Sequence, residues 1–101
     1  MINLTRDLLA DYLRKIEPRQ VDNRGRYKPV PESRLRTFAA AREVLTNNNM
    51  ATATLAAAVA ITTTAAHKHE ADVGQVWKFV RRYRELIHEH AEQLRLPLTR
   101  P

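Results

Sequence analysis

Apolar residues recur at intervals of three and four along most of the chain, which is the spacing of one face of an α-helix. The pattern predicts a first helix over residues 4–16, with Thr5 and Asp7 at a capped start. Pro18 ends this helix, because the residue before a proline is displaced from the helical region. A second helix is predicted over about 31–45. Its inward-facing positions are Leu35, Phe38, Ala41 and Leu45.

One threonine and three asparagines at 46–49 predict a stop, followed by a short third helix over about 50–59. From Thr62 the apolar positions keep one helical phase and pass Gly74 without a slip. We therefore predict one long helix over 62–95, with a kink at Gly74 as the alternative and an end at Leu96-Pro97. No segment alternates as a strand would, so the predicted fold is all-α.

The segment 52–71 resembles the helix-turn-helix of small phage and plasmid repressors. Ala56 matches the position that such motifs keep small, and Val59, Ile61 and Ala66 match their buried positions. The resemblance implies a motif over 50–72 with its turn at Ala60-Ile61, where Ala60 replaces the usual glycine. It also implies sequence-specific binding of double-stranded DNA by a transcriptional regulator, which would act as a dimer on a palindromic site.

The residues that follow this turn would then enter the major groove of DNA. They are Thr62, Thr63, Thr64, His67 and Lys68, with Ala71 kept small so that the helix can approach. Helical geometry adds a second argument, because a polar face lies opposite the buried positions of the predicted long helix. That face holds Thr64, Lys68, Ala71, Gln75, Lys78 and Arg82. It suits base contacts, although Glu70 and Asp72 flank it and an ordinary solvent face is the alternative.

Composition agrees with a polyanionic partner. The 101 residues include 17 Lys+Arg and 11 Asp+Glu, so the formal charge is +6 and the isoelectric point is about 10.3. A soluble protein that happens to be basic is the alternative. The chain has no cysteine, no secretory apolar segment and no run of roughly 18 apolar residues. We expect a single cytoplasmic domain.

The segment 17–31 has no helical periodicity and reads as a basic loop or arm. Arg19, Arg24, Arg26 and Lys28 surround Tyr27 in this segment. Such an arm can follow DNA phosphates or enter the minor groove. A solvated linker is the equal alternative.

Metal binding and catalysis are not expected from these residues. His67 and His69, like His88 and His90, are two positions apart, so on a helix they point about 200° apart and cannot share one ion. The chain has no glycine-rich phosphate loop and no cysteine nucleophile. We therefore expect no cofactor and no enzymatic activity.

The predicted long helix is apolar on more than one side. One stripe, expected to serve core or dimer packing, consists of Val73, Val76, Trp77, Val80, Tyr83 and Ile87. Phe79 and Leu86 project nearly opposite, so either the first two helices or a second copy of the chain must cover them. We expect a homodimer. The alternative function is a small helical interaction module or inhibitor that binds an acidic protein.

Overall fold

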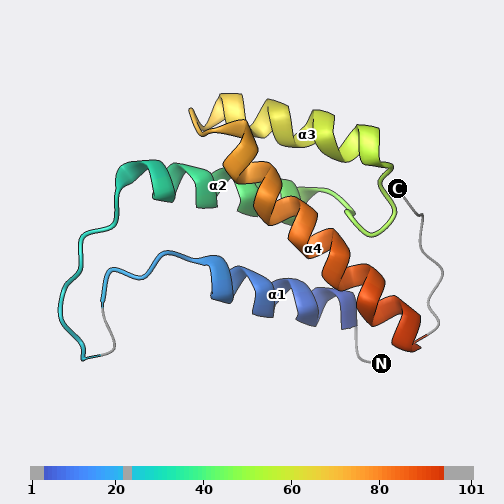
Figure 1. Cartoon of the computed structure of the whole chain (residues 1–101), viewed down its shortest axis with the longest axis horizontal. Helices are drawn as coiled ribbons and strands as arrows, with labels where there is room; N and C mark the ends of the chain where they lie inside the picture. Colours follow the sequence, from blue (N-terminus) through green and yellow to red (C-terminus); the bar gives the residue numbers. More distant parts are fainter. Residues whose placement is uncertain (1–3, 22–23, 95–101) are drawn as a thin grey trace.

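The computed structural model describes residues 4–21 and 24–94, with side chains over 7–21 and 24–90, and this part of the chain is all-α (Figure 1). Its helices are α1 (Leu4–Ile16), α2 (Glu32–Asn47), α3 (Leu55–Lys68) and α4 (Val73–Leu94). The predicted helix over 4–16 is confirmed, and α2 extends two residues beyond its predicted end. The predicted cap at Thr5 and the predicted stop at Leu96-Pro97 lie outside the described side chains and residues.

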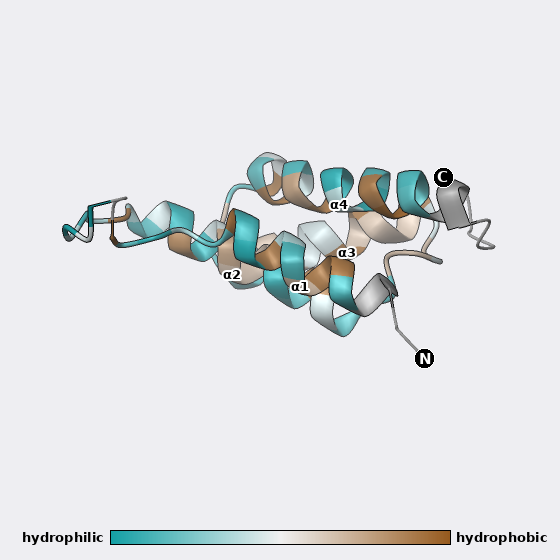
Figure 2. Ribbon diagram, turned by 90° about the horizontal axis from the view of Figure 1, so that it is seen from below, coloured by the Kyte–Doolittle hydropathy of each residue, from teal (hydrophilic) through white to brown (hydrophobic). Residues whose placement is uncertain are grey.

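The helices are arranged so that α1, α2 and α3 lie side by side and α4 crosses all three (Figure 1). Consecutive helices run in roughly opposite directions, and α2 separates α1 from α3, which do not contact each other. The apolar residues of α4 face the other helices (Figure 2). The apolar side of α4 therefore packs against α1, α2 and α3.

Small residues make up much of the core between α2, α3 and α4, so these helices can approach closely. Val44, Val76, Val80 and Thr62 have no exposed surface, and the Thr62 hydroxyl donates a hydrogen bond of 2.7 Å to the Ala58 carbonyl. Because this hydroxyl is satisfied within its own helix, its burial costs little. The other buried apolar residues are Tyr12, Ala40, Ala41, Leu45, Met50, Ala51, Ala58, Ala65, Ala66, Tyr83 and Ile87.

Two tyrosines attach α1 to α4. The Tyr12 hydroxyl donates a 2.7 Å hydrogen bond to the Phe79 carbonyl, and the rings of Tyr12 and Tyr83 lie 5.4 Å apart between centroids. Phe79 and Leu86 are partly buried against the core. The first two helices or a second copy of the chain were expected to cover Phe79 and Leu86. Within the single chain, the core already covers part of both side chains.

The prediction of one helix over 62–95 is wrong, because the chain turns at residues 69–72. The Ala71 amide donates to the Ala66 carbonyl at 2.8 Å, and the Glu70 amide donates to the His67 carbonyl at 3.2 Å. This pair of bonds ends a helix in a Schellman motif, in which the residue after the cap takes a left-handed conformation. That residue is Glu70, with a φ of 53°.

The start of α4 has its own cap. An oxygen of the Asp72 side chain accepts a 3.0 Å hydrogen bond from the Gln75 amide. Gly74 lies in the first turn of α4 and is not the point at which the chain bends. Because the turn spans only four residues, Ala66 and Val73 keep helical spacing across it.

The predicted turn at Ala60-Ile61 is also wrong, since α3 runs through both residues. Its N-cap is Thr54, whose side chain accepts a 3.2 Å hydrogen bond from the Ala57 amide. The Thr63 hydroxyl donates back to the Val59 carbonyl at 2.8 Å, so the threonines continue the helix and do not interrupt it. The helix-turn-helix expected over 50–72 is therefore absent with those bounds.

A buried arginine holds the connection between α2 and α3. Arg84 of α4 is 4% exposed, and its Nη1 donates to the carbonyls of Met50 (3.1 Å) and Ala53 (2.9 Å). Burial lowers the pKa of Arg84. This residue ties residues 48–54 to the last helix.

Candidate nucleic-acid interface

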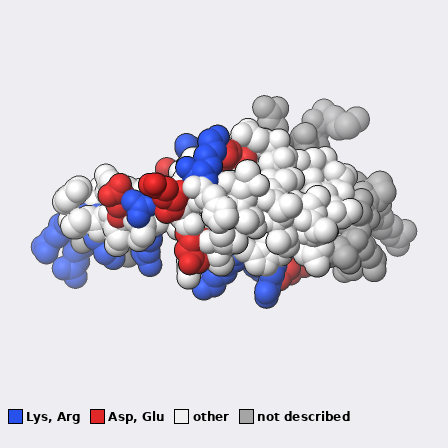
Figure 3. Space-filling view, turned by 90° about the horizontal axis from the view of Figure 1, so that it is seen from above, with Lys and Arg blue, Asp and Glu red and all other residues white. Residues whose placement is uncertain are grey.

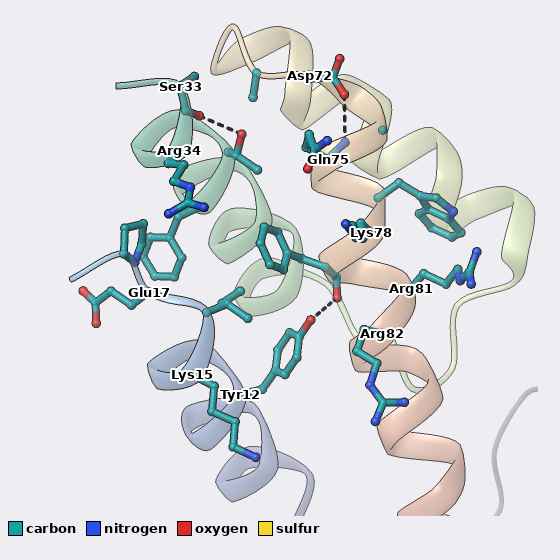
Figure 4. Close-up of a pocket in the computed structure, with 18 of the residues that line it drawn as sticks. Tyr12, Lys15, Glu17, Ser33, Arg34, Asp72, Gln75, Lys78, Arg81 and Arg82 are labelled. Carbon is teal, nitrogen blue, oxygen red and sulfur yellow. Dashed lines mark hydrogen bonds between the residues drawn. The ribbon is translucent and has the colours of Figure 1, made fainter. Parts of the chain in front are cut away.

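A groove of about 1460 Å³ opens between the end of α1, the first half of α2 and the first half of α4. It exists because α4 crosses the molecule obliquely, so its start lies over α2 and its end lies beside α1 (Figure 1). Figure 4 shows Gln75 on the side of α4 that faces α2, with Arg34 of α2 and Lys78 of α4 directed toward the opening.

Five cations without a carboxylate partner line this groove. They are Lys15, Arg19, Lys28, Arg34 and Lys78, and none of them forms an ion pair with another described side chain. All five are exposed. They come from α1, from both sides of the α1–α2 connection, from α2 and from α4. Folding therefore brings together positive charges that lie far apart in the sequence.

The two exposed arginines farther along α4, Arg81 and Arg82, form ion pairs within the helix. The Nη1 of Arg82 lies 3.1 Å from an oxygen of Glu85 and 3.4 Å from one of Glu89, and the Nε of Arg81 lies 3.3 Å from Glu85. The hydrogen bond with Glu85 raises the pKa of Arg82, and the hydrogen bonds with Arg82 and then Arg81 lower the pKa of Glu85. Among the described side chains of α4, Lys78 near its start is therefore the exposed cation without a carboxylate partner.

Below the cations the groove is apolar. Ile16, Phe38 and Phe79 line it, together with Tyr12, whose hydroxyl is occupied by the Phe79 carbonyl. Burial raises the pKa of Tyr12 to about 12, so this phenol is neutral at physiological pH. The floor supplies no charge of its own.

The α1–α2 connection forms an arm that projects beyond the helices (Figures 1 and 2). An isolated bridge joins Val21 to Tyr27, and the Lys28 amide donates to the Gln20 carbonyl at 2.6 Å. Gly25 has a φ of 78°, which a turn of this kind requires and which glycine adopts without strain. Arg24 and Arg26 flank this glycine and are exposed, and Tyr27 is 74% exposed. The arm therefore presents cations and one aromatic ring to solvent.

The α3 residues expected to read DNA are not suited to that role as a group. Thr62 is fully buried, so the prediction that it contacts DNA is wrong. The hydroxyls of Thr63 and Thr64 already donate to the carbonyls of Val59 and Ala60, at 2.8 and 3.1 Å. Of the expected α3 set, Thr64, His67 and Lys68 have exposed side chains.

Lys68 is engaged with α2. Its Nζ donates a 2.8 Å hydrogen bond to Glu43, and the Nε2 of His69 lies 3.4 Å from the same carboxylate oxygen. The hydrogen bond from Lys68 is the main cause that lowers the pKa of Glu43. This pair joins the end of α3 to α2, and it occupies the one lysine of α3.

The remaining expected residues divide between the groove and the core. Ala71 and Gln75 line the groove, as do Lys28 and Lys78. In the predicted packing stripe, Val76, Val80, Tyr83 and Ile87 are buried, whereas Val73 and Trp77 are partly buried. Lys15 and Arg34 were missed as site residues. For Arg34 and Lys78 one signal was present in the sequence, because neither has an acidic residue three or four positions away.

No family model, no curated protein and no solved structure matches this chain. Within residues 4–21 and 24–94, no helix is both long and apolar enough to cross a membrane. The same residues contain no group of three side chains that could hold a metal ion.

Proposed function

We propose that this protein binds double-stranded DNA through the groove and the adjoining arm, as a small regulator of the phage or plasmid kind. The observation that carries the proposal is the convergence of five unpaired cations on one opening. Phosphate contacts from lysine and arginine supply most of the affinity of proteins for DNA. The groove lining also contains Glu17, Glu70, Asp72 and Glu85, but its seven lysines and arginines outnumber these four carboxylates, so the lining keeps a net positive charge.

In this proposal α4, and not α3, is the helix that faces DNA. Gln75 and Lys78 are one turn apart on α4 and both line the groove. A glutamine can pair with adenine and a lysine with guanine in the major groove. The arm, with Arg24, Arg26 and Lys28, would follow the phosphates beside this helix. Reading a palindromic site would require two copies related by a two-fold axis.

Salt-dependent binding of a labelled duplex, measured by fluorescence anisotropy, tests the proposal. Single variants Lys28→Gln, Arg34→Gln and Lys78→Gln should each weaken binding. Each should also lower the slope of log affinity against log salt by about 0.9 for a lost phosphate contact. Arg14→Gln is the matched control, because Arg14 is exposed on α1 and pairs with Asp11 outside the groove. Equal slopes for all four variants would contradict the proposal.

A second candidate function follows from the apolar floor beneath the cations. An acidic protein segment with an apolar side could place its carboxylates on the rim and its apolar residues against Ile16, Phe38 and Phe79. The same variants distinguish the two functions. If the groove binds an acidic amphipathic peptide, Lys28→Gln, Arg34→Gln and Lys78→Gln should weaken binding of that peptide. Binding of such a peptide, with no duplex binding at low salt, would put this function first.

A further inference from the structure

The surface of α3 differs from every other part of the described chain. No Asp, Glu, Lys or Arg occurs from residue 44 to residue 66, although the whole chain carries a net charge of +6. Leu55 is 47% exposed and Val59 is 43% exposed, and Ala56 and Ala60 are also exposed. Figure 3 shows a broad surface without Lys, Arg, Asp or Glu over most of α3, and charged side chains gather toward the Lys68 end of the helix and the arm. A helix that is apolar on all sides is normally buried.

The polar groups on this face need no water. The Thr63 hydroxyl donates to the Val59 carbonyl and the Thr64 hydroxyl donates to the Ala60 carbonyl. Covering the face would therefore leave no hydroxyl donor unpaired, and the threonines would present mainly their methyl groups. The same bonds make Thr63 and Thr64 poor donors to a nucleic acid.

We infer that the outer face of α3 is the surface on which a second copy of this chain docks. The name "α3 face" refers here to Leu55, Ala56, Val59, Ala60, Thr63 and Thr64. The distribution of charge selects the occupant. An acidic or basic partner would find no opposite charge among these six residues, whereas a second α3 face is equally uncharged. Glu43, which lines a hollow with Ala60 and Thr64, is already paired with Lys68.

The remaining charge of the two copies also favours this pairing. The cations of the groove and the arm lie away from the α3 face, so a two-fold pairing through α3 keeps like charges apart. Ala56 and Ala60 allow the two helix backbones to approach closely, while Leu55 and Val59 supply apolar contact on the flank. Over its described side chains, residues 73–90, α4 offers no comparable surface, because Phe79 and Leu86 are already partly buried against the core.

This inference is independent of DNA binding, because its test uses the protein alone. Sedimentation velocity over about 1–100 μM protein should show a dimer that dissociates on dilution. Ala60→Glu places two carboxylates near the centre of the interface and should weaken dimerisation roughly 100-fold or more. Ala60 is exposed in the single chain, so the variant should keep its circular dichroism spectrum. Ala10→Glu on the exposed side of α1 is the matched control and should sediment like the wild type.

Cross-linking provides a second measurement, because the chain has no cysteine of its own. In a two-fold pair of antiparallel α3 helices, a residue near the axis lies opposite its own copy. Ala60→Cys should therefore form a disulfide between two chains under mild oxidation, and Ala10→Cys should not. A monomeric wild type at the highest concentration, or a dimer that Ala60→Glu leaves unchanged, would overturn the inference.

Discussion

Arg84 of α4 holds the connection between α2 and α3 through hydrogen bonds to its backbone. Its guanidinium is buried, and it donates to the carbonyls of Met50 and Ala53 from a helix more than thirty residues away. Arg84 lies four residues after Val80 and three before Ile87, so helical spacing places it at the edge of the apolar stripe. The spacing does not indicate which carbonyl groups it contacts. The 48–54 segment has no regular structure, and these two bonds join its backbone to the last helix.

We expect Arg84→Met to lower the free energy of unfolding by about 1–3 kcal/mol, because two carbonyl groups lose charged donors and methionine supplies none. Urea unfolding followed by circular dichroism measures the change. Arg14→Met serves as the control, and its effect should stay within about 0.5 kcal/mol because the Arg14–Asp11 pair is exposed. An equal effect of the two substitutions would show that the bonds of Arg84 contribute nothing.

The helices predicted from the sequence differ most from the observed ones at the turn between α3 and α4. Ala66 and Val73 are seven residues apart, so the apolar phase continues across residues 69–72 as it would in an unbroken helix. The usual marker of a helix end, glycine, is replaced by Glu70. One signal remained, since Asp72 followed by Gln75 has the spacing of a helix cap. By contrast, the end of α1 before Pro18 could be predicted because it depends on adjacent residues alone.

The candidate site divides in the same way. The arm cations and the pair Gln75 and Lys78 could be predicted, because each group lies within one segment. Lys15 and Arg34 could not, because their place beside the groove depends on how α1 and α2 pack against α4. Local spacing carries no information on that packing. The buried position of Thr62 has the same origin, since α3 extends across the predicted turn.

Glu70→Gly should stabilise the α3–α4 turn. A left-handed conformation costs a residue with a Cβ roughly 1 kcal/mol, and glycine avoids this cost while losing somewhat more chain entropy on folding. We expect the free energy of unfolding to rise by about 0.5–1 kcal/mol. Glu70→Ala keeps the Cβ and removes the charge, so it should leave stability nearly unchanged. A destabilised Glu70→Gly variant, measured by urea unfolding, would contradict the assigned turn.

The stability of the entire protein should fall in alkaline solution. Burial raises the pKa of both Tyr12 and Tyr83 to about 12, from an ordinary value of 10.0. The folded protein therefore keeps two protons that the unfolded chain releases above pH 10. Their contribution to stability is complete below pH 10 and is lost as the pH rises toward 12.

We expect the unfolding free energy to decrease steeply across this window, with helix loss and phenolate absorbance rising together. The double variant Tyr12→Phe, Tyr83→Phe retains the rings and removes both titrating groups, so its alkaline decrease should be shallower. At neutral pH it should be less stable by about 1 kcal/mol, because the hydrogen bond from Tyr12 to the Phe79 carbonyl is lost. If the unfolding free energy of the double variant fell as steeply with pH as that of the wild type, the decrease would come from lysines and not from these tyrosines.

The position of α4 across the other helices has a consequence for the order in which the protein can fold during translation. α4 packs on each of the other three helices, and it is the last described helix to leave the ribosome. At a synthesis rate of roughly 5–20 residues per second, the surfaces that α4 covers stay exposed to water until it emerges, whereas α2 can already pack against α1 and α3. Until then, the carbonyls of Met50 and Ala53 also lack their hydrogen bonds from Arg84. Nascent chains that stop before α4 should therefore be recognised by chaperones, and the fold should close in one late step.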